Sequence, residues 1–131
     1  MTAVPTLRIA RPSNDLAALR AFYVEGAGLQ VLAEFAGHDG FDGLIVGYAG
    51  AAWHLEFTRE AGAVAPAAPS TEHRLVLYVP DRSAWEAAVD RMTRFGATPV
   101  PAHNPYWDRQ GVTFVDPDGY GLVFQNAAWS A

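Results

Sequence analysis

Cysteine and lysine are both missing from this chain of 131 residues. Without cysteine the protein can form neither a disulfide nor a thiolate site, and we expect a cytoplasmic protein. The nine basic residues are all arginines, and alanine is abundant. This composition is typical of a protein from a high-GC bacterial genome.

A surplus of positive charge is also lacking. The formal net charge is −5, so the basic face that nucleic acids require is not expected. No apolar run approaches the roughly 18 residues that span a bilayer. Residues 1–5 have neither a basic segment nor a long apolar stretch, so we expect no signal peptide and no membrane partner.

Several catalytic motifs are absent as well. The glycines of Gly37 to Gly43 come without the lysine and helix start of a phosphate-binding loop. None of the serines lies in a Gly-x-Ser-x-Gly nucleophile elbow. No acid is placed to face Glu56 as a glycoside-hydrolysing pair. The sequence therefore gives no support for a phosphate-binding loop, a serine nucleophile or glycoside hydrolysis.

What the chain does have is an order of elements that occurs twice. Half of its residues are hydrophobic, and its length is that of one domain. Residues 6–58 predict strand, helix and three strands, with the helix capped by Asn14 or Asp15 and stopped by Gly26 and Gly28. Residues 59–72 predict a linker, and residues 73–126 repeat the order. The strands are predicted at residues 7–10, 29–35, 44–46, 52–58, 74–79, 98–101, 112–115 and 122–125.

The second module has clear end signals. Asp81 predicts the start of its helix and Gly96 the end. The sequence Asp116-Pro117-Asp118-Gly119 predicts the turn of a closing hairpin, because proline presets one dihedral angle and glycine allows a positive one.

The fourth strand of the first module carries chemistry on one face. Alternation places His54, Glu56 and Thr58 on one side, and Leu55 and Phe57 on the other. In the second module, Tyr78, Thr113 and Gln125 are likewise expected on the face opposite the helix. We predict an α+β fold in which two βαβββ modules form a half-open barrel, with helices outside and a concave cleft within. Such clefts are common sites for small ligands.

These segments resemble the vicinal oxygen chelate superfamily, which includes glyoxalase I, extradiol dioxygenases and bleomycin-resistance proteins. The resemblance extends from about Leu7 to Asn126. It rests on three segments: Asn14-Asp15-Leu16 with Phe22-Tyr23 and Gly28-Leu29, then His54-Leu55-Glu56-Phe57, and finally Asp116-Pro117-Asp118-Gly119-Tyr120. It implies the paired-module fold, a small organic ligand and a homodimer.

The resemblance also implies where a divalent metal would be held. The corresponding positions here are Arg8, Glu56, Arg74 and Val123, of which only Glu56 is a ligand type. An arginine is protonated and has no lone pair for a cation. A slip of one residue would bring His73 to the site, but it would also turn Leu75 and Leu77 toward the cleft.

Each candidate side chain has a functional and a structural interpretation. Glu56 is either a ligand-contacting carboxylate or general base, or the partner of Arg8 or Arg74 in an ion pair. His54 is either a ligand contact or a rim residue. Tyr106 and Trp107 either stack on a flat ligand or fill the end of the barrel. The expected ligand-binding residues are Arg8, His54, Glu56, Arg74, Tyr78, Tyr106, Trp107 and Gln125.

Other polar residues are expected to be structural. Asn104 should fix the loop before Pro105. We expect Arg11, His38 and His103 to be solvated on the surface.

The leading hypothesis is a small-molecule-binding protein with a degenerate metal site and no cofactor, which sequesters a drug or metabolite. The alternative is a lyase, isomerase or dioxygenase that uses a divalent metal ion held by Glu56, His54 and His73. A third possibility is metal-free catalysis with Glu56 or His54 as the base.

Overall fold

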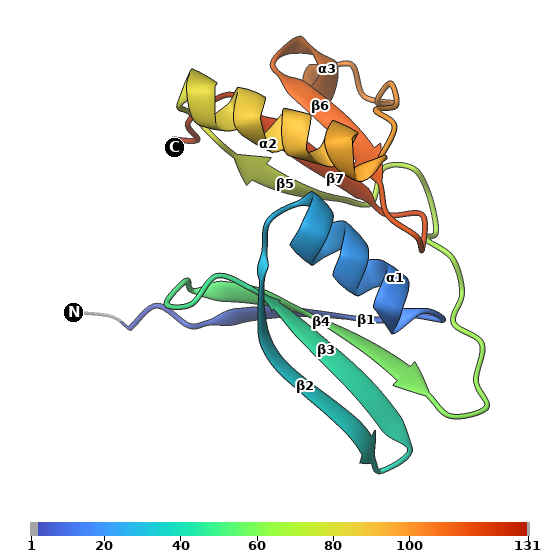
Figure 1. The fold of residues 1–131 in the computed structure, drawn as a ribbon. Helices are drawn as coiled ribbons and strands as arrows, with labels where there is room; N and C mark the ends of the chain where they lie inside the picture. The colour runs from blue at the N-terminus through green and yellow to red at the C-terminus, as the bar shows by residue number, and fades with distance from the viewer. Residues whose placement is uncertain (1–2, 131) are drawn as a thin grey trace. The chain divides into compact units, whose positions relative to one another are not determined.

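The computed structural model describes residues 3–130, which fall into two compact units divided between Pro66 and Ala67. Each unit consists of a β-sheet with a helix along one face (Figure 1). The predicted α+β class with two sheets is therefore confirmed. Within residues 3–130, no helix is long and apolar enough to cross a membrane.

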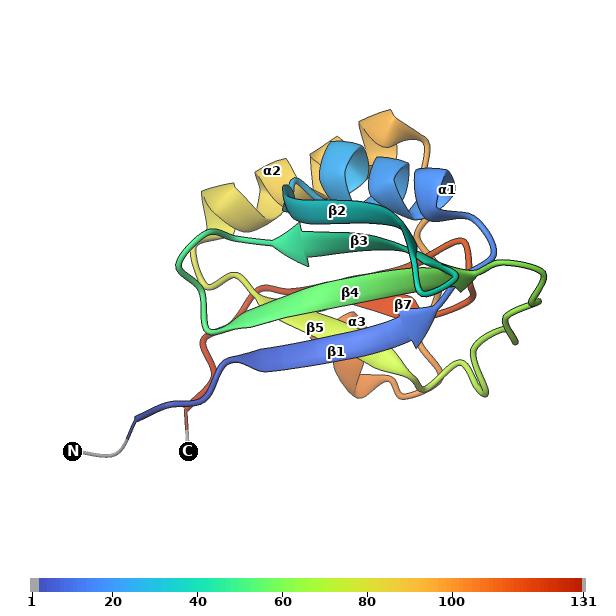
Figure 2. The same ribbon diagram turned by 90° about the horizontal axis from the view of Figure 1, so that it is seen from below.

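The first unit contains a four-stranded sheet in the order β1-β4-β3-β2 (Figure 2). β1 is parallel to β4, and the other neighbouring pairs are antiparallel. The helical segment between β1 and β2 begins as an α-helix and continues as a π-helix. The elements are β1 (Leu7–Pro12), α1 (Leu16–Arg20), η1 (Ala21–Gly26), β2 (Gln30–His38), β3 (Phe41–Gly47) and β4 (Trp53–Glu60).

The helical segment begins where the sequence predicts. The side chain of Asp15 accepts a hydrogen bond of 3.0 Å from the backbone N–H of Ala18, which caps α1. Leu19, Phe22 and Tyr23 are buried, and the ring of Tyr23 stacks on Phe57 of β4 at 5.1 Å. The apolar side of β4 therefore faces the helix, and the opposite side of the same strand carries His54 and Glu56.

Arg11 corrects one prediction. It was expected to be solvated, but it is only 9% exposed and lies on the helix-covered face of the sheet. Its guanidinium is 5.1 Å from the ring centroid of Phe57, and its Nη2 donates to the hydroxyl of Tyr23 at 3.1 Å. Because Arg11 is three residues from Arg8, strand alternation sends their side chains to opposite faces.

The second unit contains a three-stranded sheet in the order β5-β7-β6. β5 is parallel to β7, and β7 is antiparallel to β6. The helix α2 lies along one face of this sheet (Figure 1), and the indole Nε1 of Trp85 donates to the carbonyl of Phe124 at 2.8 Å. Leu122 and Phe124, which alternate with Val123 and Gln125 along β7, are buried. The elements are β5 (Arg74–Tyr78), α2 (Arg82–Phe95), α3 (Tyr106–Arg109), β6 (Gly111–Val115) and β7 (Gly121–Gln125).

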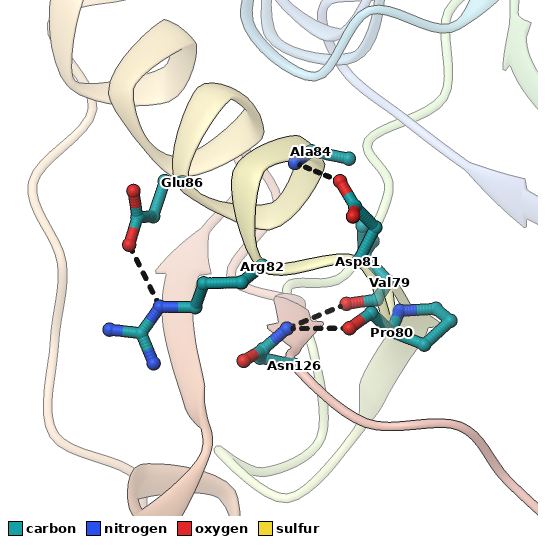
Figure 3. A network of polar contacts seen from close by, with 7 residues as sticks. All are labelled: Val79, Pro80, Asp81, Arg82, Ala84, Glu86 and Asn126. Atoms are coloured by element: carbon teal, nitrogen blue, oxygen red, sulfur yellow. Dashed lines mark hydrogen bonds and ion pairs between the residues drawn. The ribbon is translucent and has the colours of Figure 1, made fainter.

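A polar network fixes the start of α2 (Figure 3). The side chain of Asp81 accepts from the N–H of Ala84 at 2.8 Å and caps the helix. Asn126, just after β7, donates to the carbonyl oxygens of Val79 and Pro80 at 3.0 and 3.2 Å. The turn from β5 into α2 is thereby tied to the end of β7. At its other end, α2 stops at Gly96, whose φ is +106°.

One strand predicted for the second unit does not form. Residues 98–101 form a single β-bridge from Val100 to Thr113 in place of a strand. Pro99 and Pro101 lack the N–H groups that a strand would donate. Residues 106–109 form the short helix α3, for which no element was predicted.

The hairpin turn is as predicted. Asp116 accepts hydrogen bonds through Oδ1 from the N–H groups of Asp118 and Tyr120, at 2.8 and 3.1 Å. Gly119 has a φ of +90°, a conformation that favours glycine. The turn sets the register of β6 against β7, and this register decides which side chains share the polar face.

Candidate functional site

The polar face of the first sheet brings Arg8, His54 and Glu56 together. In the parallel pairing of β1 and β4, Arg8 lies opposite His54 and Ala10 lies opposite Glu56. Arg8 Nε donates to Nε2 of His54 at 2.8 Å, and Arg8 Nη1 donates to Oε2 of Glu56 at 3.3 Å. One guanidinium thus contacts both polar side chains of β4.

The contact with Arg8 fixes the role of each nitrogen of His54. An arginine can only donate, so Nε2 of His54 must accept through its lone pair. The proton of the neutral ring is then on Nδ1. His54 can offer this N–H to an oxygen of a ligand, whereas its Nε2 lone pair is already in use.

The ion pair leaves Arg8 accessible. The side chain of Arg8 is 48% exposed and that of Glu56 only 16%. A guanidinium has five N–H donors, and two of them are used here. The other three can bind acceptor groups of a ligand, while the largely covered carboxylate holds the guanidinium in place.

The donor set does not fit a divalent metal ion. Two of the positions that the superfamily resemblance assigns to metal ligands cannot bind a cation. Arg8 is itself a cation paired with Glu56, and Val123 is an apolar side chain with 0% exposure. Arg74 is a second guanidinium. Within each unit, residues 3–130 contain no group of three His, Asp or Glu side chains that could hold a metal. The positive charge beside Glu56 belongs to Arg8.

The polar face of the second sheet carries Arg74, Thr113 and Gln125. Arg74 of β5 extends across Gly121 of β7 toward β6, where its Nη1 donates to Oγ1 of Thr113 at 3.3 Å. A Cβ atom on Gly121 would lie 3.1 Å from Cγ of Arg74. Because Gly121 has no side chain, there is room for Arg74 to cross the sheet at this point.

Gln125 lies further along β7 on the same face. It is only 2% exposed, and its Oε1 has no hydrogen-bond partner in the described part of the chain. A Cβ atom on Gly111 would overlap this oxygen, so glycine there lets the carboxamide pack close to β6. Tyr78, which pairs with Gln125, is 36% exposed.

Tyr106 and Trp107 are placed by α3 and not by a strand. Their rings meet edge to face with centroids 4.8 Å apart, and Tyr106 is 47% exposed. Asn104 accepts from the N–H of Tyr106 at 3.0 Å, which agrees with its predicted role in the loop. The two aromatic residues are thus held by a local turn of helix beside β6.

The remaining histidines have surroundings of their own. His73 bonds to Oγ of Ser70 at 2.9 Å within the second unit. His38 is exposed and lies 3.5 Å from Asp39, and His103 is also exposed. Among the described residues of the first unit, His54 is thus the histidine that shares a strand face with Glu56.

Two domain models of one family match this chain. The YycE-like N-terminal domain matches residues 7–58, and the YycE-like C-terminal domain matches residues 72–126. The chain belongs to the YycE-like family. The uncharacterized protein YycE of Bacillus subtilis (strain 168) is 42% identical over 122 residues, which cover 92% of this chain and 87% of that protein.

Solved structures place this family in the vicinal oxygen chelate superfamily. A crystal structure of B. subtilis YycE, a protein of unknown function, has a TM-score of 0.87 at 40% identity and covers 95% of this chain and 90% of that chain. TnmS3, an antibiotic-binding protein from Streptomyces sp. CB03234, has a TM-score of 0.65 at 26% identity and covers 95% of each chain. Leishmania major glyoxalase I has a TM-score of 0.74 at 20% identity over 95% of this chain and 88% of that chain, and it shares the fold.

Sequence reasoning missed how both arginines are held. It expected Arg8 near Glu56 but not the hydrogen bond from Arg8 to His54. It also overlooked Gly121, whose lack of a side chain makes room for Arg74. A glycine in a strand is a signal for close approach of another group, and this signal was available in the sequence.

Proposed function

We propose that this protein binds a small organic molecule at the polar face formed by Arg8, His54 and Glu56, without a metal ion held there. The observation that carries the proposal is the position of the Arg8 guanidinium, which contacts both His54 and Glu56. The cation at this face is then part of the protein, and ligand recognition relies on hydrogen bonds.

The chemistry of this face favours a ligand with acceptor oxygens. Arg8 has free N–H donors and His54 has its Nδ1–H, whereas the acceptor of the group, Glu56, is largely covered and already paired. A carbonyl or hydroxyl oxygen can accept from Arg8 and His54 together. Burial of an apolar part of the ligand would supply the remaining affinity.

A related protein supports a binding role. TnmS3, whose fold and length match this chain, is an antibiotic-binding protein. By analogy, sequestration of a drug or metabolite is the biological role that we propose. Arg74, Tyr78, Tyr106, Trp107 and Gln125 stay predicted ligand contacts in the second unit, and the homodimer and the cytoplasmic location stay predictions as well.

The proposal can be tested with a fragment library. Binding would be screened by thermal shift, and the dissociation constants of the hits would be measured by titration calorimetry on the wild type, Arg8→Met and Glu56→Gln. We expect Arg8→Met to weaken oxygen-bearing hits about tenfold or more, because a hydrogen bond to a charged group is worth about 1.5–3 kcal/mol.

The first unit offers matched controls. Arg20 and Glu34 form an exposed ion pair of 2.7 Å that involves neither His54 nor Glu56. Arg20→Met and Glu34→Gln should leave the same dissociation constants unchanged. Hits that bind equally well to Arg8→Met and to the wild type would refute the proposed site.

A further inference from the structure

The second unit holds a guanidinium, that of Arg74, with no carboxylate partner among residues 67–130. Arg74 is half-buried, and within the described residues of its unit its single polar contact is the hydroxyl of Thr113. In the same unit, Arg82 and Arg94 of α2 form ion pairs with Glu86 and Asp90. A half-buried charge without a counter-ion is costly, so its retention calls for an explanation.

We propose that Arg74 and Thr113 bind the carboxylate group of a small organic acid. The inference extends the proposed function, since it assigns a ligand class to the polar face of the second sheet taken by itself. The carboxylate would supply the counter-ion that the unit itself does not give to Arg74. A guanidinium and a carboxylate also match in shape, because both are planar and can form two parallel hydrogen bonds.

The geometry of the sheet supports a built site. Gly121 lets Arg74 lie across β7, and the hydroxyl of Thr113 in β6 accepts a hydrogen bond from Nη1 of Arg74. Thr113 is only 2% exposed, so the hydroxyl that orients the guanidinium is itself fixed in the sheet. One of five N–H donors is used, which leaves four for an anion.

A second observation on the same face points to a ligand. Gln125 is 2% exposed, and its Oε1 has no hydrogen-bond partner among residues 3–130. Buried polar atoms of this kind nearly always have a partner. An N–H or O–H group of the organic acid would satisfy this oxygen, while its carboxylate pairs with Arg74.

The charge balance favours a monoanion. A single unpaired guanidinium is neutralised by one carboxylate, whereas a phosphate dianion would leave one negative charge on a half-buried face. Acids should therefore bind better than their neutral amides, which have the same shape. This difference can be measured without knowing the natural ligand.

The test uses 4-fluorobenzoate and 4-fluorobenzamide, titrated into the full chain and followed by ¹⁹F NMR. In the wild type we expect the acid to bind about tenfold more tightly than the amide, in line with the strength of hydrogen bonds to charged groups. In ¹H–¹⁵N spectra of the same samples, the Nε–H resonance of Arg74 should shift when the acid is added. Equal affinity for acid and amide in the wild type would overturn the proposal.

Variants assign the preference to Arg74. Arg74→Met should abolish this preference, and Thr113→Val should weaken binding of the acid about threefold, since it removes the one neutral hydrogen bond that orients the guanidinium. Arg74→Lys keeps the charge but loses the planar fork, so it should bind the acid more weakly than the wild type while still preferring it to the amide. It serves as the test if Arg74→Met does not fold. The exposed Arg94→Met is the matched control and should behave as the wild type.

The outcome separates this inference from the proposed function. A preference for the acid that persists in Arg74→Met would overturn the role of Arg74, whatever happens at Arg8. In the opposite case, Arg74→Met loses the preference while the fragment hits bind Arg8→Met as tightly as the wild type. This result would support the inference and refute the proposed site on the first sheet.

Discussion

At the scale of single residues, the two arginines of β1 show how one strand serves two purposes. Arg8 and Arg11 point to opposite faces, so one contacts His54 and Glu56 and the other packs on Phe57 and Tyr23. The first belongs to the candidate site, and the second stabilises the packing of the helix on the sheet.

Arg11 should matter for stability. We expect Arg11→Met to lower the free energy of unfolding by about 2 kcal/mol, because it removes a cation–π contact and a buried hydrogen bond to Tyr23. Urea denaturation followed by circular dichroism would measure the change. Arg94→Met, at an exposed ion pair, should change stability by less than about 0.5 kcal/mol. Equal effects of the two substitutions would show that Arg11 is a surface residue, as the sequence alone suggested.

The contacts of Glu56 were only partly predictable from the sequence. Alternation in residues 53–58 correctly placed His54 and Glu56 on the face opposite Leu55 and Phe57. It could not determine whether Arg8 or Arg74 would pair with Glu56, because that depends on the pairing of β1 with β4. The observed ion pair is with Arg8.

At the scale of elements, the end signals of helices and turns were the most reliable predictors. Asp15, Asp81, Gly96 and the Asp116–Gly119 turn all act as expected, since each relies on contacts within a few residues. The bridge at Val100 and the helix α3 were missed. Prolines at positions 99, 101 and 105 flank these segments, and tertiary packing decides what such short stretches form.

The cap of α2 provides a test at this scale. Asp81→Ala should lower the free energy of unfolding by about 1 kcal/mol, because the N–H of Ala84 loses its acceptor at the start of the helix. The measurement is again urea denaturation. As a control, Asp90→Ala removes one partner of an exposed i,i+4 pair in the same helix and should cost no more than about 0.5 kcal/mol. A larger loss for Asp90→Ala than for Asp81→Ala would contradict the capping role.

At the scale of the whole molecule, the two units follow one plan. Each has a sheet with an apolar face against a helix and a polar face that carries an arginine at a position where the superfamily resemblance implies a metal ligand. The resemblance predicted the fold class correctly, because the repeated order of strands and helices can be read from the sequence. It could not predict how each guanidinium would be held, since this depends on Gly121, Thr113 and His54 in their folded positions.

The central claim is that Arg8 supplies the positive charge beside Glu56 and that no divalent ion is held there. Titration calorimetry of tag-free protein with Zn²⁺, Ni²⁺, Mn²⁺ and Fe²⁺, together with elemental analysis of the purified chain, tests it most directly. We predict a metal content well below one ion per chain and no tight binding of any of the four ions. One ion bound tightly per chain, and lost in Glu56→Ala, would contradict the account and favour the metal-dependent enzyme.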